Sequence, residues 1–358
     1  MLPSRSVSGR RKAAAVAAGL ALVLGMPLTA VAAPQREDPV SAATSRPGPT
    51  TDPGFPTFVH LPADQAAHPG VQWEWWYTIG HFNAGGRKYG YEVQLSASGL
   101  VQIGLTDMTA GTFDSEVTRF AAGTFSASAT TLDVQMPNAS LSGPIDDMHL
   151  KADLPHGRGT IDFTLNAAGP SLYDNGTGLF PFLGGTSYYY SLPNLRTTGT
   201  LTLDGKAQRV NGTSWLDRQW GNWDWAQIHK WTWMALRLSN GQTLNLWNML
   251  DTTGETHWAT VLSPDGSVRV VSVEPLARHA TNFQTSPATG QRYAGKWTVK
   301  IPSLGAVLTV TAKPVVQEME VGLPWSPGIN EAAGSTYGTY QGRPVTGEAF
   351  VEQYGLWQ

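Results

Sequence analysis

Residues 231–250 of the 358-residue chain, WTWMALRLSNGQTLNLWNML, alternate apolar and polar side chains on both sides of Asn240-Gly241. A period of two residues is typical of a β-strand, and an Asn-Gly pair favours a two-residue hairpin turn of type I′. Such a turn would pair Ser239 with Gln242. Other turn pairs separate short alternating runs, at Gly85-Gly86, Asp204-Gly205 and Asp265-Gly266. We find no helical pattern of convincing length after the N-terminal segment, so the chain is predicted to be all-β.

The strand before this turn has two apolar faces. Alternation places Met234, Leu236 and Leu238 on one face and Trp231, Trp233, Ala235 and Arg237 on the other. The two-residue turn would also pair Met234 with Trp247. Because both faces carry large apolar side chains, we expect one face to pack a core and the other to meet a cavity or a second domain.

Glycine and proline interrupt two further stretches, 181–192 (PFLGGTSYYYSL) and 322–334 (GLPWSPGINEAAG), which we expect to be loops. Many short antiparallel strands favour barrels or sandwiches, and the length suits two of them. We therefore expect an N-terminal domain at 55–223 and a C-terminal domain at 224–358. This division places the most tryptophan-rich segment at the junction.

The N-terminal segment has the three parts of a secretory signal peptide, which we assign to residues 1–32. These are the basic residues Arg5, Arg10, Arg11 and Lys12, an apolar run that ends near Leu28, and an Ala30-Val31-Ala32 cleavage site. The apolar run is short for a membrane span, so we expect no stable span. Arg10-Arg11 leaves a twin-arginine route open. Residues 33–54 are rich in Pro, Ser, Thr and Ala and are predicted to be a disordered linker. The protein is therefore expected to be secreted or extracytoplasmic.

Composition excludes several classes of protein. The chain has no cysteine, so disulfides, cysteine nucleophiles and thiolate metal sites are excluded. Without the predicted signal peptide it has 20 Lys and Arg against 27 Asp and Glu, and no basic run, so nucleic acid is not an expected partner. The eight histidines show no metal-ligand spacing, and no nucleophile elbow or dinucleotide-binding glycine motif occurs. We expect no metal and no cofactor.

Two stretches place five of the 14 tryptophans beside acidic residues. In the first, WEWWY, alternation points Trp73, Trp75 and Tyr77 to one side and Glu74 and Trp76 to the other. A carboxylate among indoles is costly to bury unless it is paired, so a structural role is favoured over a catalytic one for Glu74. Trp75 and Tyr77 are expected to line a cavity.

The second stretch is SWLDRQWG at 214–221. Trp215 and Asp217 share one face, and Arg218 takes the opposite face, so Arg218 need not neutralise Asp217. If Asp217 lies among Trp215, Trp220 and tyrosines with no cation nearby, desolvation would raise its pKa and make it a proton donor at neutral pH. The alternative is an aspartate that caps a turn.

Four stretches in this order, EWWYTIGHF, SYYYSLPNLRTTGTL, GTSWLDRQWG and GRPVTGEAFVEQYG, resemble the AttH/carotenoid 1,2-hydratase-like superfamily. That superfamily includes hydroxyneurosporene synthases and kievitone-hydratase-like proteins, and the resemblance extends from about Phe55 to Gly355. It implies two lipocalin-like antiparallel β-barrel domains in tandem, with a ligand cavity.

The resemblance also implies a chemistry without a cofactor. In carotenoid hydratases an Asp protonates an isoprenoid double bond, aromatic residues stabilise the carbocation, and water captures it. By motif that Asp is Asp217, with Trp215 in place of a Tyr, and Tyr188 and Tyr190 in place of a His-x-Trp pair. The expected catalytic residues are therefore Asp217, Trp215, Tyr188 and Tyr190. The expected substrate-binding residues are Glu74, Trp75, Tyr77, Trp220, His229, Trp231 and Trp233.

The expected function is that of an exported, cofactor-independent hydratase that acts on the alkene of a small apolar, prenyl- or isoprenoid-like substrate. Two alternatives stay open: a lipid- or metabolite-binding barrel without turnover, and a cyclase or isomerase that works by folding its substrate. The environment of Asp217 distinguishes them. An apolar cavity without a cation favours the acid, whereas a salt bridge to Arg218 or Arg237 opposes it.

Overall fold

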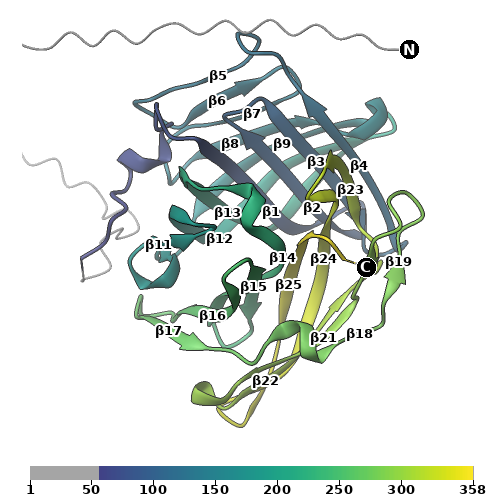
Figure 1. The fold of residues 1–358 in the computed structure, drawn as a ribbon. Coiled ribbons are helices and arrows are strands. Elements are labelled where there is room, and N and C mark those ends of the chain that lie inside the picture. Colours follow the sequence, from purple (N-terminus) through teal and green to yellow (C-terminus); the bar gives the residue numbers. More distant parts are fainter. Residues whose placement is uncertain (1–55, 358) are drawn as a thin grey trace, which may run out of the picture. The chain divides into compact units, whose positions relative to one another are not determined.

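The computed structural model describes residues 56–357, which fold into antiparallel strands joined by turns (Figure 1). The all-β prediction is confirmed. In the described range the helical segments are short 3₁₀ turns: η1 (Ala63–Gln65), η2 (Pro155–Gly157), η3 (Asp174–Gly176), η4 (Trp225–Gln227), η5 (Leu276–His279) and η6 (Pro302–Leu304). None of them is long or apolar enough to cross a bilayer. The predicted signal peptide at 1–32 and linker at 33–54 lie outside the described residues.

The first half of the chain forms a 13-stranded sheet in the order β4-β3-β2-β1-β13-β12-β9-β8-β7-β6-β5, with β10 and β11 paired to β12. Its strands are β1 (Trp73–Ala84), β2 (Arg87–Ser96), β3 (Leu100–Asp107), β4 (Thr112–Arg119), β5 (Ser126–Ala127), β6 (Asp133–Met136), β7 (Ala139–Ser142), β8 (Met148–Asp153), β9 (Gly159–Ala167), β10 (Leu172–Tyr173), β11 (Leu179–Phe182), β12 (Gly185–Leu203) and β13 (Lys206–Asn222).

The second half forms a 10-stranded sheet in the order β17-β16-β15-β14-β25-β24-β22-β21-β18, with β23 paired to β24. Its strands are β14 (Ile228–Leu238), β15 (Thr243–Asp251), β16 (Gly254–Leu262), β17 (Val268–Ser272), β18 (Ala280–Thr281), β21 (Lys296–Ile301), β22 (Ala306–Ala312), β23 (Glu318–Leu323), β24 (Ser326–Tyr340) and β25 (Arg343–Gly355). A small separate ladder joins β19 (Gln284–Thr285) to β20 (Arg292–Tyr293).

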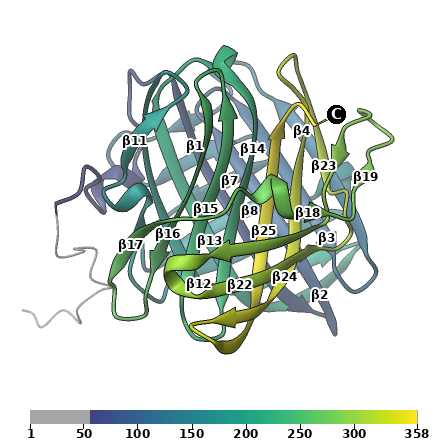
Figure 2. The same ribbon diagram turned by 60° about the horizontal axis from the view of Figure 1, so that its bottom comes forward.

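The two sheets repeat one plan of connection. Each begins with a four-stranded meander, β1–β4 or β14–β17, and the first strand of the meander pairs with the last strand of its sheet, β13 or β25. Each last strand belongs to a long hairpin, β12–β13 or β24–β25. Both sheets curl, as Figures 1 and 2 show, which confirms the lipocalin-like prediction. The chain leaves the first sheet at Asn222 and enters the second at Ile228. The division into domains at residues 223 and 224 stays a prediction.

Apolar side chains fill the interior of each sheet. Residues such as Trp76, Phe82 and Phe163 form the core of the first, and Met234, Leu236 and Val351 belong to the core of the second. A third cluster lies between the sheets. It is formed by the opposite faces of the same strands and includes Tyr77, Trp215, Trp231, Trp233 and Phe350. The expectation was that one face of residues 231–238 packs a core and the other meets a cavity or a second domain. The first face packs the second core, and Trp231 and Trp233 of the other face line a cavity.

The turn at Asn240-Gly241 differs from the prediction by one residue. Leu238 N–H donates to Gln242 O and Gly241 N–H to Leu238 O, both at 2.9 Å, and Gly241 has φ +81°. This is a three-residue turn that ends in a left-handed glycine, not a type I′ turn, which requires positive φ at both central residues. Trp247 therefore pairs with Trp233 rather than with Met234. The shift places Trp247 on the face between the sheets.

The two glycine-rich stretches expected to be loops are largely strands. Residues 181–192 belong mainly to β11 and β12, and most of 322–334 belongs to β24. Their glycines permit close approach of neighbouring backbone. A Cβ added to Gly185 would lie 1.9 Å from Asn222 O, and one added to Gly334 would lie 2.4 Å from Thr311 O. Glycine within a strand marks such contacts as readily as it marks a loop.

Candidate functional site

A cavity of about 210 Å³ lies between the two sheets, on the outer face of each. That volume is far above the roughly 10–15 Å³ that one water molecule needs. The lining comprises Trp73, Trp75, Tyr77, Gln94, Ser96, Ser98, Leu100, Gln102, Arg119, Tyr189, Asp217, Gln219, Trp225, Trp231, Trp233, Trp247, Val321, Leu323, Trp325, Ile329, Glu331, Glu352 and Tyr354. Asp217 and Glu331 are buried and Glu352 is half-buried, whereas Ser98 and Arg119 are exposed. The cavity therefore has a buried acidic end and a more open end, with indole rings between them.

Asp217 lies at the buried end. It is 2% exposed, and Trp215 Nε1 donates a hydrogen bond to its Oδ1 at 2.6 Å. Burial raises the pKa of Asp217 to about 7, although the hydroxyls of Ser191 and Tyr189 and the indole of Trp215 favour the ionised form. Among the described residues, no Lys or Arg forms an ion pair with it. The group can therefore hold a proton close to neutral pH.

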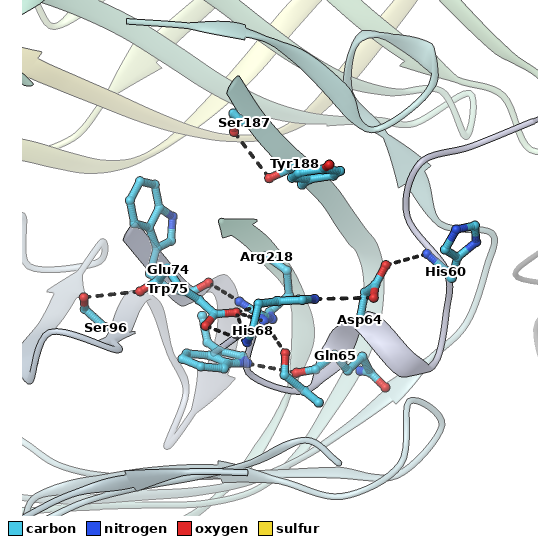
Figure 3. Close-up of polar contacts among 12 residues, drawn as sticks. His60, Asp64, Gln65, His68, Glu74, Trp75, Ser96, Ser187, Tyr188 and Arg218 are labelled. Atoms are coloured by element: carbon cyan, nitrogen blue, oxygen red, sulfur yellow. Dashed lines mark hydrogen bonds and ion pairs between the residues drawn. The ribbon is translucent and has the colours of Figure 1, made fainter. Parts of the chain in front are cut away.

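Arg218 is directed into the interior of the first sheet, where it is fully buried (Figure 3). Its Nη2 donates to Glu74 Oε1 and to Ala66 O, and its Nη1 donates to Trp75 O, all at 2.7 Å. The guanidinium also lies 4.0 Å from the centre of the Trp76 ring. Arg218 is thus occupied on the face of β13 opposite to Asp217.

Glu74 completes this network. Its carboxylate accepts from the backbone N–H of His68 and contacts His68 Nδ1 at 2.7 Å (Figure 3). Burial alone would raise the pKa of Glu74, but the hydrogen bonds from His68 and the charge of Arg218 outweigh it and lower the pKa. The contacts of Glu74 are therefore those of a residue with a structural role, and Glu74 does not line the cavity.

Three further carboxyl groups lie near Asp217. Burial and the charge of Asp217 together raise the pKa of Glu352 to about 7, although the hydrogen bond that Trp231 Nε1 donates to Glu352 Oε1 at 2.7 Å opposes the shift. Glu331 accepts a 2.6 Å hydrogen bond from the Tyr77 hydroxyl. Burial raises the pKa of Glu331 and of Glu92 well above the usual range. The charges of Glu92 and Glu352 add to the shift of Glu331, and the charge of Glu352 adds to that of Glu92. These carboxyl groups can therefore hold protons, and they cannot all be ionised at neutral pH.

Tyr188 and Tyr190 do not surround Asp217, contrary to the expectation from the resemblance. Both lie on the opposite face of the sheet, where Tyr188 stacks on Trp220 at 5.5 Å and Tyr190 is fully buried in the first core. The reason is register: Ser191 pairs directly with Asp217, so residues 189 and 191 share its face. Tyr189, the residue between the two predicted ones, lines the cavity.

The structure places the remaining predicted residues in three groups. Trp75, Tyr77, Trp231 and Trp233 line the cavity. Trp215 shares the face of Asp217 and packs edge-on against Trp233 with ring centres 6.2 Å apart. Trp220 lies on the opposite face, stacked 4.1 Å from His68, and His229 is exposed. Neither of these two residues lines the cavity.

Sequence reasoning missed Glu352 and Glu331. For Glu352 a signal was present: in AFVEQYG, alternation places it on one face with Phe350 and Tyr354, an acid between two aromatic residues. Glu331 lies in the glycine-rich stretch that was expected to be a loop, so no face could be assigned to it. In residues 56–357 no group of three or more His, Asp or Glu is arranged to hold a metal ion.

Fold and cavity together define a class of protein: two curled antiparallel sheets of similar connection, with an aromatic cavity between them that ends in buried carboxyl groups. The chain belongs to the AttH-like family, whose sequence model matches residues 53–356. This confirms the resemblance seen in the four motifs.

Two curated relatives carry names of related activities. The dehydratase asqC of Emericella nidulans is 26% identical over 219 residues, which cover 57% of this chain and 60% of the relative. The kievitone hydratase of Fusarium solani subsp. phaseoli is 26% identical over 252 residues, covering 66% of this chain and 69% of the relative. The match thus spans less than two thirds of the length of the dehydratase and slightly more than two thirds of the length of the hydratase.

Two solved structures share the fold. An AttH protein of Nitrosomonas europaea superposes with a TM-score of 0.72 at 22% identity, over 86% of this chain and 99% of its own. The kievitone hydratase of Nectria haematococca superposes with a TM-score of 0.71 at 21% identity, over 87% and 96%. The likeness extends over both sheets.

Proposed function

We propose that this protein is a hydro-lyase that adds water to, or removes it from, a small apolar substrate held in the cavity between the sheets. The substrate would present an alkene of prenyl or isoprenoid type. The observation that supports the proposal is the position of Asp217, a cation-free carboxyl at the buried end of an aromatic cavity with its pKa raised to about 7. The names of the two curated relatives, a dehydratase and a hydratase, agree with this reaction type.

In the hydration direction, protonated Asp217 gives its proton to one alkene carbon, and a carbocation forms at the other carbon. The faces of the surrounding indoles, which include Trp231 and Trp233, stabilise that positive charge. Water then bonds to the cation, and its surplus proton passes to a neighbouring carboxylate.

Glu352 is the acceptor that we assign to this proton. It lines the same cavity, its pKa is also about 7, and the charge of Asp217 raises that pKa. Two such carboxyls titrate as a pair, and one proton shared between them supplies one acid and one base at neutral pH. After hydration the proton is on Glu352, and its return to Asp217 restores the starting state. Dehydration follows the same steps in reverse.

The test is product analysis by mass spectrometry on the wild type and Asp217→Asn, each incubated with a panel of prenylated phenols and terpenoid alcohols. General acid catalysis typically contributes a factor of about 10² to 10⁴, so the variant should lose most of the turnover and still bind the compound. Asp251→Asn is a matched control, because Asp251 is a buried aspartate that accepts a hydrogen bond from Thr253 N–H at 2.7 Å and does not line the cavity.

A gain of one water that Asp217→Asn abolishes and Asp251→Asn retains supports the proposal. Compounds that bind all three proteins and return unchanged would make the protein a binding barrel. Isomerised or cyclised compounds formed equally by wild type and Asp217→Asn would make it a catalyst that folds its substrate.

Export is part of the proposal and is supported by the sequence of residues 1–32 alone. Expression in a bacterial host followed by N-terminal analysis of the protein outside the cytoplasm tests it. A mature chain that begins at Ala33 is expected, whereas an intact N-terminus on cytoplasmic protein would contradict export.

A further inference from the structure

Gln102 is a buried polar residue of the cavity wall that the proposed reaction does not use. Its side chain is 1% exposed and lines the cavity, and its Oε1 atom has no hydrogen-bond partner within the described part of the chain. Buried polar atoms in folded proteins almost always have a partner, because an unpaired acceptor costs free energy. An acceptor left open in the wall of a ligand cavity fits a donor supplied by the ligand.

Gln102 belongs to a row of side chains that crosses the first sheet. Asp217 pairs with Tyr77, Tyr77 with Gln94, and Gln94 with Gln102, on the adjacent strands β13, β1, β2 and β3. All four residues line the cavity. Neighbouring strands are spaced by about 4.8 Å, so the three steps from Asp217 to Gln102 cover about 14 Å measured along the curled sheet. The proton donor and the open acceptor therefore lie at opposite ends of one row.

The wall beside Gln102 is mixed: Gln94, which pairs with it across the strands, is polar, whereas Leu100 on the same strand is apolar. Trp75, Val321 and Leu323 also line the cavity with apolar surface. A ligand hydroxyl at this position would gain a buried hydrogen bond, whereas a ligand without a donor would leave Oε1 unpaired.

We propose that Gln102 Oε1 accepts a hydrogen bond from a hydroxyl or N–H at one end of the substrate, about 14 Å along the curled sheet from the atoms that react at Asp217. This inference rests on the proposed function and narrows the substrate class. The substrate is an extended apolar molecule with a hydrogen-bond donor at one terminus and a reactive alkene, or the corresponding tertiary alcohol, at the other.

Binding of farnesol and of farnesyl methyl ether tests the inference. Farnesol is a chain of three isoprene units with a hydroxyl at one end and an alkene in the last unit, and the ether lacks only the donor. Titration followed by tryptophan fluorescence should show that wild type binds farnesol about 5- to 10-fold more tightly than the ether, the range of one net hydrogen bond. Gln102→Met, which keeps the length of the side chain but removes its acceptor, should reduce that ratio to about 1.

Gln65→Met is the matched control. Gln65 is a buried glutamine of the first core, its Nε2 contacts Met148 Sδ, and it does not line the cavity, so this variant should keep the wild-type ratio. Should Gln102→Met not fold, Gln102→Asn withdraws the amide by one carbon and is expected to lower the ratio at least threefold. An equal ratio in wild type and in the folded Gln102 variant, or no preference in wild type, would overturn the inference.

The same titrations in an Asp217→Asn background separate the two proposals. If the preference for farnesol persists but neither the wild type nor any variant forms a hydrated or dehydrated product, the Gln102 subsite is supported and the hydro-lyase is refuted. Loss of hydration in Asp217→Asn without any preference for farnesol refutes the subsite alone.

Discussion

Asp217 and Arg218 are consecutive in the chain, yet their side chains lie on opposite faces of β13. Asp217 faces the cavity between the sheets without a cationic partner, and Arg218 faces the first core, where it pairs with Glu74 at 2.7 Å. Because side chains alternate along a β-strand, the positive charge of Arg218 is held away from the acid that precedes it in the sequence. This separation allows the pKa of Asp217 to stay raised.

Arg218 should matter for stability rather than for chemistry. Arg218→Met leaves Glu74 buried without its main charged partner, and breaking a buried pair in this way costs about 3–5 kcal/mol in the free energy of unfolding. Adding Glu74→Gln should recover part of that loss, because the unpaired charge is removed. Urea unfolding of the single and double variants measures both effects.

An exposed arginine provides the comparison for that cycle. Arg158 pairs with Asp114 and Asp204 at the surface, so Arg158→Met should change the free energy of unfolding little. If Arg218→Met were equally mild, the buried network in Figure 3 would not contribute to stability as described.

The raised pKa of Asp217 should appear in the pH dependence of stability. The carboxyl titrates near 7 in the folded chain and near 3.9 when unfolded, so between about pH 4 and pH 7 the folded state binds more protons. The free energy of unfolding therefore falls as pH rises through this window. Asp217→Asn removes this contribution, and the loss of stability between about pH 5 and pH 8 should shrink by about 2 kcal/mol. Identical pH slopes in both proteins would contradict the raised pKa.

Glu352 should set one limb of the pH–rate profile. If Asp217 acts as acid and Glu352 as base, kcat/KM for hydration is bell-shaped around about pH 7, the region in which both titrate. Glu352→Gln should lower turnover at the optimum and remove the fall on the acidic side, while the fall on the alkaline side remains. Glu348→Gln is the control: Glu348 lies on the same strand, pairs with Arg237 and does not line the cavity. An unchanged bell in Glu352→Gln would remove Glu352 from the mechanism.

Packing between the sheets should be sensitive to any side chain added at Gly90 of β2. A Cβ at this position would lie 2.3 Å from the Cβ of Ala333 on β24, an atom that moves only with its backbone. Gly90→Ala should therefore destabilise the protein by about 1–3 kcal/mol, as overpacking does. Ala333→Gly removes the opposing atom, so the double variant should regain stability relative to Gly90→Ala in thermal unfolding. Absence of rescue would mean that the two strands are less close than described.

Much of the local structure could be predicted because a strand has a period of two residues. The sequence determined the all-β class, the separation of Asp217 from Arg218, and the side of the strand on which Trp231 and Trp233 lie. These properties depend only on neighbours within one strand, so they need no knowledge of the partner strands.

Register and packing between strands decided the rest. Trp247 reached the cavity because the hairpin turn has three residues rather than two, and Tyr189 replaced Tyr188 and Tyr190 because Ser191 pairs with Asp217. Glu331 and Glu352 meet Asp217 from more than a hundred residues away, through the packing of the second sheet against the first. A sequence pattern orients side chains along one strand, but only the tertiary structure decides which faces of distant strands enclose the same space.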